Sequence, residues 1–416
     1  MSRVDLNTLN FFSPEVQECP FQVYQQLQEE APVWQIPGTS MFLVTRFNDV
    51  REIIRDPERF SSSFGALLNA GSGAKAVDEI YEQGYPMVET LLTLDPPRHR
   101  VYRSLVNKVF SNKRVESMRP YMEQMTNELI DDWIDEGEVD LMNRLAVPLP
   151  LYVIADQLGV PRSELPLLKK WSDASASRLG QLADAEGQVQ NARDIVEFQH
   201  YFAALMDRMR ETPEDNIISD LANATIDEGR LLTKAEALGM IQQILVAGNE
   251  TSTSAIAGGV LLLIQNPDQQ TLLRQQPEWI PGAVEEILRL ETPTSGMWRL
   301  ATTDSEVGGV TIPKGSIVMV RFAAANRDEC VFSDGGTMKV DRDNADGHLA
   351  FGQGTHFCLG AQLARTEIQI ALTALLRRTD NWALVEGKNS LEHNPNVLLR
   401  GLKDLHISFD KVNEAA

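Results

Sequence analysis

The longest predicted helix in the chain covers residues 233–265. Thr233 followed by Glu236 is a capping-box signature for a helix start, and Asn266-Pro267 marks the helix end. About 32 residues at ~1.5 Å each give a helix of ~48 Å, long enough to cross the whole molecule. Such a helix must be buried along much of its length, and apolar residues agree with this, among them Ile241, Ile244, Leu245, Ala255 and Val260.

Shorter helical patterns dominate the rest of the chain. We expect helices at residues 48–55, after residues 95–97, across 165–209 with a break near 179–187, from about 281, and after 359. Strands are predicted at residues 42–45 and as two short strands around the Pro-Lys-Gly turn within 307–315. Residues 61–83 read as a loop with one short helix at most. The pattern therefore predicts a mainly α fold with small β-sheets, and the absence of any linker or repeat favours a single domain over residues 1–416.

Composition and charge narrow the class of protein. Hydrophobic residues make up 43% and charged residues 23%, which are ordinary globular values. The formal net charge of −21 argues against nucleic acid and anionic membranes as partners. The longest apolar run, residues 255–264, is about half the ~20 residues that span a bilayer, and the first residues lack a signal peptide. With three cysteines at no metal-ligand spacing, these features predict a cytoplasmic protein without a membrane anchor.

The candidate chemistry centres on residues 351–360, Phe-Gly-Gln-Gly-Thr-His-Phe-Cys-Leu-Gly. Gly352 and Gly354 permit backbone angles that other residues resist. Cys358 then lies near the predicted helix start, where free amides and the helix dipole should lower the thiol pKa and favour the thiolate. A turn that presents one thiolate suggests a single axial bond to iron, although a lone cysteine is more often a buried structural residue.

The ten residues together resemble the haem-binding loop of the cytochrome P-450 family. Phe351, Gly352, His356 and Gly360 hold the family's order around the cysteine. The resemblance implies the P-450 fold, with the haem between a long distal helix and a proximal helix. It also implies that Cys358 is the proximal thiolate ligand of a haem b.

The centre of the long helix, Ala-Gly-Asn-Glu-Thr-Ser-Thr at 247–253, contains residues that cost helix stability. By itself this heptapeptide is consistent with a kink or a solvated patch. The resemblance instead implies the distal groove of the family. Ala247 and Gly248 then leave room for dioxygen, Glu250 is the acid and Thr251 the alcohol of a proton relay.

Other motifs of the family occur in the expected order. His99 and Arg103 lie on one helix face and, with Arg299 and His356, are implied to bind the haem propionates. Glu286 and Arg289 match the structural Glu-x-x-Arg, which as an isolated surface pair is worth only ~0–1 kcal/mol. Glu329 replaces the family's usual proline, which puts only the local geometry in doubt. Implied pocket residues are Val88, Leu91, Ile244, Ala247, Ser295, Met297 and Val397.

The resemblance implies a haem-thiolate monooxygenase that inserts one oxygen atom from O2 into a lipophilic molecule such as a steroid, terpenoid or fatty acid. Electrons would come from a ferredoxin or flavodoxin with its NAD(P)H reductase. A basic patch for this partner is formed by Arg98, Arg100, Lys108, Lys113 and Arg114, or these are ordinary solvated charges. The alternatives are a peroxide-driven peroxygenase and a haem-binding sensor or carrier without turnover, neither of which needs the acid–alcohol pair.

Overall fold

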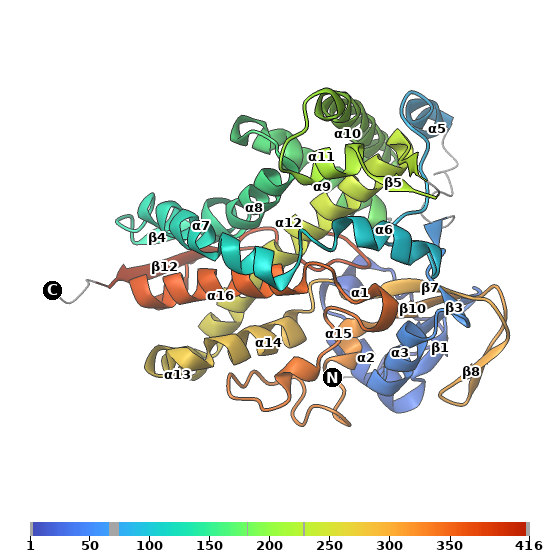
Figure 1. Cartoon of the computed structure of the whole chain (residues 1–416). Helices are drawn as coiled ribbons and strands as arrows, with labels where there is room; N and C mark the ends of the chain where they lie inside the picture. Colours follow the sequence, from blue (N-terminus) through green and yellow to red (C-terminus); the bar gives the residue numbers. More distant parts are fainter. Residues whose placement is uncertain (1–2, 66–74, 181, 228, 413–416) are drawn as a thin grey trace.

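The computed structural model describes residues 3–65, 75–180, 182–227 and 229–412. Figure 1 shows helices through most of the molecule, with the largest sheet at the right beside α2 and α3. The α-helices are α1 (Pro14–Glu18), α2 (Phe21–Glu30), α3 (Phe47–Arg55), α5 (Lys75–Tyr81), α6 (Arg98–Val106), α7 (Asn112–Asp131), α8 (Pro148–Leu158), α9 (Leu165–Gly180), α10 (Ala185–Glu211), α11 (Ile217–Ala222), α12 (Lys234–Gln265), α13 (Pro267–Gln275), α14 (Ile280–Glu291), α15 (Phe322–Ala325) and α16 (Ala361–Arg378). Short 3-10 and π segments are η1 (Met142–Ala146), η2 (Arg162–Glu164), η3 (Pro277–Trp279), η4 (Ala345–Gly347) and η5 (Gly354–His356).

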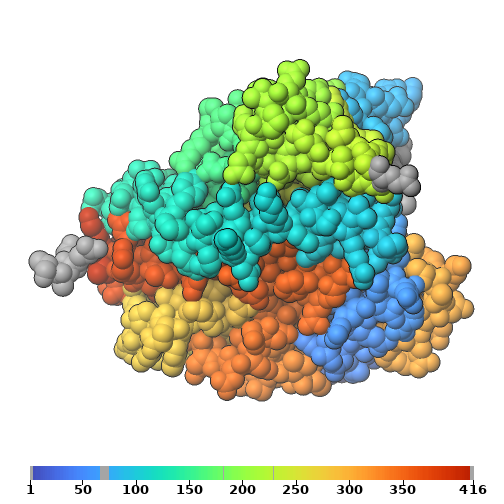
Figure 2. Space-filling model, in the orientation of Figure 1, coloured from blue at the N-terminus to red at the C-terminus, as the bar shows by residue number. Residues whose placement is uncertain are grey.

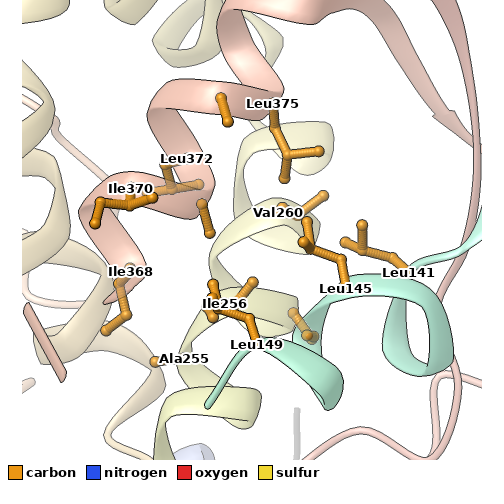
Figure 3. Close-up of a cluster of buried hydrophobic side chains, with 14 of the residues drawn as sticks. Leu141, Leu145, Leu149, Ala255, Ile256, Val260, Ile368, Ile370, Leu372 and Leu375 are labelled. Atoms are coloured by element: carbon orange, nitrogen blue, oxygen red, sulfur yellow. The ribbon is translucent and has the colours of Figure 1, made fainter. Parts of the chain in front are cut away.

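The long central helix predicted from the sequence is confirmed as α12, with 32 residues. Its N-cap Thr233 and Glu236 form the reciprocal capping box. The C-terminal half of α12 packs between η1–α8 and α16, and its Ile256 and Val260 belong to the main apolar core (Figure 3). The N-terminal half of α12 packs in a second apolar cluster, so apolar contacts hold the helix on both sides of its polar centre. Among the described residues, no helix has both the length and the apolar character to cross a membrane.

Small sheets account for the described strands, as the sequence predicts. The largest has the order β1-β2-β10-β7-β3, with β2 and β10 parallel and the other pairs antiparallel. The register of β7 against β10 pairs Arg299 with Val318. The strand bounds are β1 (Val33–Gln35), β2 (Met41–Val44), β3 (Phe60–Ser61), β4 (Glu138–Asp140), β5 (Thr225–Ile226), β6 (Arg230–Leu231), β7 (Met297–Ala301), β8 (Ser305–Val307), β9 (Val310–Ile312), β10 (Ile317–Val320), β11 (Thr379–Leu384) and β12 (His406–Lys411).

A tight hairpin occupies part of the segment predicted as two short strands around the Pro-Lys-Gly turn. Strands β8 and β9 pair around Gly308 and Gly309, which have φ angles of 56° and 79°. Two consecutive positive φ angles suit a tight hairpin turn, and glycine adopts them without strain. The Pro-Lys-Gly turn does lie between two strands, β9 and β10, but these strands pair with other strands and not with each other.

Candidate active site

The loop before α16 presents Cys358 close to the start of that helix. The Cys358 backbone N–H donates to the Phe351 carbonyl at 2.9 Å, which closes the loop. Gly354 has a φ of 71°, and a Cβ there would lie 3.0 Å from the Ile54 carbonyl of α3, so glycine allows the loop to pack closely on α3. The helix begins at Ala361 with Gly360 as its N-cap, slightly later than the sequence pattern indicates.

The thiol pKa of Cys358 is raised, not lowered. Burial is the largest cause, and it outweighs the Gly360 backbone N–H and the charges of Arg103 and Arg365, which favour the thiolate. The prediction of a lowered pKa was therefore wrong, because sequence reasoning counted the helix terminus but not the desolvation. The charges of Arg103 and Arg365 and the Gly360 N–H are the features of this site that favour the thiolate, the form of cysteine that binds a metal.

Four basic side chains from three regions of the chain meet beside this loop. The His99 and His356 rings lie 4.3 Å apart between centroids. Arg103 donates to the Phe357 carbonyl at 2.7 Å, and Arg299, on β7, is buried. Among the described residues, His99 Nδ1 and His356 Nε2 are buried without a hydrogen-bond partner. Because buried polar atoms are normally paired, these atoms point to an acidic ligand group.

Burial sets the charge state of this cluster. It lowers the pKa of His356 to about 3, with the charge of Arg299 as the second cause. It lowers the pKa of Arg299 to about 10, so the guanidinium keeps its charge at neutral pH. The pKa of His99 is also lowered by burial. The histidines are therefore neutral hydrogen-bonding groups, and the arginines supply the positive charge.

A cavity of about 380 Å³ connects the Cys358 loop with the central helix. Its lining contains Cys358, the four basic residues and three residues of the predicted distal groove, Ala247, Gly248 and Thr251. Phe351, Gly352 and Gly360 also line it. Residues that are more than 250 positions apart in the sequence thus face one mostly apolar space, as the sequence motifs predict.

The predicted acid and alcohol of α12 have different surroundings. The Thr251 hydroxyl donates to the Ala247 carbonyl at 2.9 Å and faces the cavity. Glu250 is directed toward α9, where the Ser172 hydroxyl donates to it at 3.3 Å and Lys169 Nζ lies 3.8 Å away. Burial raises the pKa of Glu250 to about 7. Gly248 also allows close helix packing, since a Cβ there would lie 3.1 Å from Ile154 of α8.

The predicted substrate-pocket residues divide into two groups. Leu91, Ile244 and Met297 line the cavity together with Ala247. Val88 is 37% exposed and lines a second cavity of about 70 Å³. Ser295 and Val397 are buried, but neither is among the described residues lining the main cavity. Sequence reasoning missed several lining residues, since burial toward a cavity has no sequence signature: Ser175, Arg178, Leu179, Gln242, Gln243, Thr294 and Leu399.

Glu286 and Arg289 of α14 form a fully buried ion pair, not a surface one. Arg289 Nε lies 2.7 Å from Glu286 Oε2 and Nη2 donates to Glu286 Oε1, while Nη1 donates to the Asn326 and Gly335 carbonyls. Arg342 adds a second guanidinium at 3.0 Å from Glu286. Arg342 was not identified from the sequence because it lies more than fifty residues from Glu286 along the chain. The pair thus fixes the segment that leads into the Cys358 loop.

Glu329 replaces the proline typical of the family motif. Its carboxylate accepts hydrogen bonds from the backbone N–H groups of Asp334 and Gly335, each at 2.9 Å. The side chain therefore closes this loop by hydrogen bonding.

Glu367 of α16 lines the cavity and was not singled out in the sequence. The Ser252 hydroxyl donates to its carboxyl group at 2.6 Å, and burial raises the pKa of Glu367 to about 8.

Comparison with known proteins identifies the family. The family model described as cytochrome P-450 matches residues 185–404. Cytochrome P-450 monooxygenase PikC from Streptomyces venezuelae is 36% identical over 402 residues, covering 95% of this chain and 92% of that protein. The chain belongs to the cytochrome P-450 family. A second relative, the 6-deoxyerythronolide B hydroxylase of Saccharopolyspora erythraea, is 36% identical over 94% of this chain and 96% of its own length.

Solved structures confirm the P-450 fold predicted from the sequence. A cytochrome P-450 from Bacillus megaterium in complex with testosterone has a TM-score of 0.83 and 31% identity, covering 95% of this chain and 99% of that one. The structure of a cytochrome P-450 from Chondromyces apiculatus has a TM-score of 0.84 and 31% identity, covering 98% and 100%. This P-450 is a monooxygenase that uses haem iron, O2 and a redox partner.

The residues of the cavity fit a haem. Cys358 is a buried sulfur donor, and the nearby arginines and unpartnered histidine nitrogens match two acidic propionate groups. Among the described residues, no group of three or more His, Cys, Asp or Glu side chains could hold a metal ion. A lone thiolate suits an iron whose other ligands come from a macrocycle.

Proposed function

We propose that this P-450 is a haem b monooxygenase that inserts one oxygen atom from O2 into a lipophilic small molecule. Its electrons come from a ferredoxin or flavodoxin with an NAD(P)H reductase, and residues 1–416 act as one catalytic domain. The observation that carries the proposal is the cavity shared by Cys358 and Thr251, whose lining also includes apolar residues such as Leu91, Ile244 and Met297. One relative is named a 6-deoxyerythronolide B hydroxylase and one neighbour binds testosterone, which supports a lipophilic substrate.

Each group of residues has a separate task in this proposal. Cys358 binds the iron, while Arg103 and Arg299 neutralise the propionates and His99 and His356 donate to them. When bound, the haem supplies the activation of O2, which a thiolate ligand favours. The chain's own contribution is to hold the group, to exclude water with an apolar wall, and to deliver protons.

Proton delivery is assigned to Glu250 and Thr251. Thr251 holds its hydroxyl at the cavity surface, and Glu250, the preceding residue, lies beside the partly exposed Lys169 and Asp173 of α9. A carboxyl with a pKa of about 7 exchanges protons readily at neutral pH. Glu250 therefore takes a proton from the α9 side, and the Thr251 hydroxyl holds it near the place where dioxygen reacts.

The test combines a spectrum with coupled turnover. Reduced protein under carbon monoxide should show the strongly red-shifted Soret band of thiolate ligation, and Cys358→His should abolish it. Thr251→Ala should keep haem and substrate binding but divert electrons to hydrogen peroxide, lowering the product formed per nicotinamide consumed. Ser254→Ala is the matched control, because the Ser254 hydroxyl makes the same bond to the preceding turn at 2.8 Å but lies outside the described lining of the cavity.

Three results would contradict the proposal. A Soret band at the ordinary position in the wild-type protein would exclude Cys358 as the ligand. Equal coupling in Thr251→Ala and Ser254→Ala would exclude Thr251 from proton delivery. Turnover with peroxide alone, at least as fast as with a surrogate ferredoxin system, would exclude dependence on an electron-transfer partner.

A further inference from the structure

Arg178 is a charged residue of the cavity lining that lies on a different element from the groups near Cys358. It belongs to α9 and lines the cavity with Ser175 and Leu179 of the same helix. The other ionisable side chains of the described lining lie on α6, β7, α16 and the loop before it: His99, Arg103, Arg299, His356, Cys358 and Glu367. The haem site assigned above uses five of these six, but it gives Arg178 no role.

The position of Arg178 follows from its neighbours. Ser175, one turn earlier on α9, accepts a hydrogen bond from Gln242 of α12 at 2.8 Å. Arg178, Gln242, Gln243 and Thr93 line both cavities, so they form the wall between them. Gln242 precedes Thr251 by nine residues on α12, which is about 13 Å along the helix axis. The guanidinium therefore lies at the end of the cavity away from Thr251.

The surroundings of Arg178 suit an anionic ligand group. Burial lowers its pKa, and the Tyr81 phenol partly offsets this. The Tyr81 ring lies 5.6 Å from the guanidinium carbon, on the side of α5. Glu89, which lines only the smaller cavity, accepts a hydrogen bond from the Ser63 hydroxyl. A guanidinium has five N–H donors, so Arg178 can keep its protein contacts and still bind a carboxylate.

We propose that this P-450 takes amphiphilic substrates that carry a carboxylate at one end, bound by Arg178, with an apolar chain extending past Ile244 toward Cys358. The proposal rests on the proposed function, and it refines the substrate class. The walls between the two ends agree with it, since Leu91, Ile244, Ala247 and Met297 are apolar while Ser175, Gln242 and Gln243 surround the Arg178 end. A substrate held in this way is oxidised at the chain end far from its carboxylate.

The test uses the haem-loaded protein and four ligands with the same chain: dodecanoic acid, methyl dodecanoate, dodecan-1-ol and dodecyl phosphate. Binding is measured by the Soret spin-state shift and independently by calorimetry. The wild-type protein should bind dodecanoate more tightly than the ester and the alcohol. Arg178→Gln should weaken dodecanoate binding about tenfold and leave ester binding unchanged. Arg178→Lys should retain part of the affinity, since it keeps the charge but not the two-pronged donor geometry.

The control is Arg208→Gln, which removes an exposed guanidinium from the neighbouring helix α10 and should change no affinity. Equal binding of the acid and the ester by the wild-type protein would overturn the proposal, as would equal losses for both ligands in Arg178→Gln. Tighter binding of dodecyl phosphate than of dodecanoate would also overturn it, in favour of a phosphate ester. The carbon monoxide spectrum is independent of these outcomes, so a normal thiolate band without carboxylate preference rejects only this inference.

Discussion

At the scale of single residues, desolvation decides the chemistry of the site. Arg299 stays charged although burial lowers its pKa to about 10, whereas His356, with a pKa of about 3, is neutral. Burial likewise raises the pKa of the Cys358 thiol. Motifs in the sequence identify these side chains, but their charge follows from how much water the fold removes around them.

Haem retention should follow this distinction between charged and neutral anchors. Arg299→Ala should speed haem loss to an apomyoglobin acceptor by about tenfold or more, because a buried propionate loses its counter-charge. His99→Ala should have a smaller effect, since His99 contributes a hydrogen bond. Arg114→Ala, which removes an exposed arginine, should match the wild-type rate. The assignment fails if all three variants release haem at the same rate.

Proton delivery should titrate with Glu250. Its pKa is about 7, so the carboxylate form that can accept a proton from solvent is lost as the pH falls through this value. The coupled turnover rate of the wild-type protein should therefore show a step near pH 7. The Glu250→Gln variant should turn over more slowly than the wild-type protein. Its rate should lack the step near pH 7 and should show a larger solvent isotope effect. An unchanged pH profile in the variant would assign the step to another group.

At the scale of elements, helix α14 shows how burial changes the stability that one sequence motif contributes. Glu286 and Arg289 are fully buried and bonded to backbone carbonyls and to Arg342, whereas Glu116 and Arg119 on α7 have the same spacing on the surface. A surface pair contributes ~0–1 kcal/mol, but breaking a buried pair costs ~3–5 kcal/mol because one charge is left alone. The sequence pattern is identical in both cases.

A pair of substitutions measures this difference. Arg289→Ala should lower the apparent melting temperature strongly, while Arg119→Ala should change it little. Arg289→Lys keeps the charge but cannot reach both the carboxylate and the carbonyls, so it should be intermediate. Circular dichroism melts of haem-loaded protein provide the measurement. Similar melting temperatures for Arg289→Ala and Arg119→Ala would show that the buried network is not needed for stability.

At the scale of the whole molecule, one face carries a cluster of basic side chains although the net charge of the protein is negative. The net charge is −21, yet Arg100, Lys108, Lys113 and Arg114 are exposed on α6, α7 and the segment between them. Figure 2 shows this cyan segment as a band beside the orange segment that carries the Cys358 loop and α16. Arg98, predicted for the same patch, instead lies 3.4 Å from Asp227 and is partly neutralised. Phe357, 41% exposed, adds an apolar side chain next to Cys358.

An acidic electron donor should therefore dock on this face. The double variant Lys113→Glu, Arg114→Glu should slow reduction by a ferredoxin several-fold at low salt, and the difference should shrink as salt screens the charges. The matched control is Lys388→Glu, which changes a lysine in the turn after β11. Stopped-flow reduction under carbon monoxide measures the rate. Equal rates for the double variant and the control would place the docking site elsewhere.

The sequence by itself determined the elements and the family. The capping box at Thr233, the glycines before Cys358 and the helical periodicity of α12 act over a few residues, so they could be read directly and proved correct. Tertiary structure alone decided the raised pKa of Cys358, the pairing of Arg342 with Glu286, and the exclusion of Val88 from the main cavity. The reason is physical: desolvation and cavity lining depend on which distant elements pack together, as α9 and α12 do around Arg178.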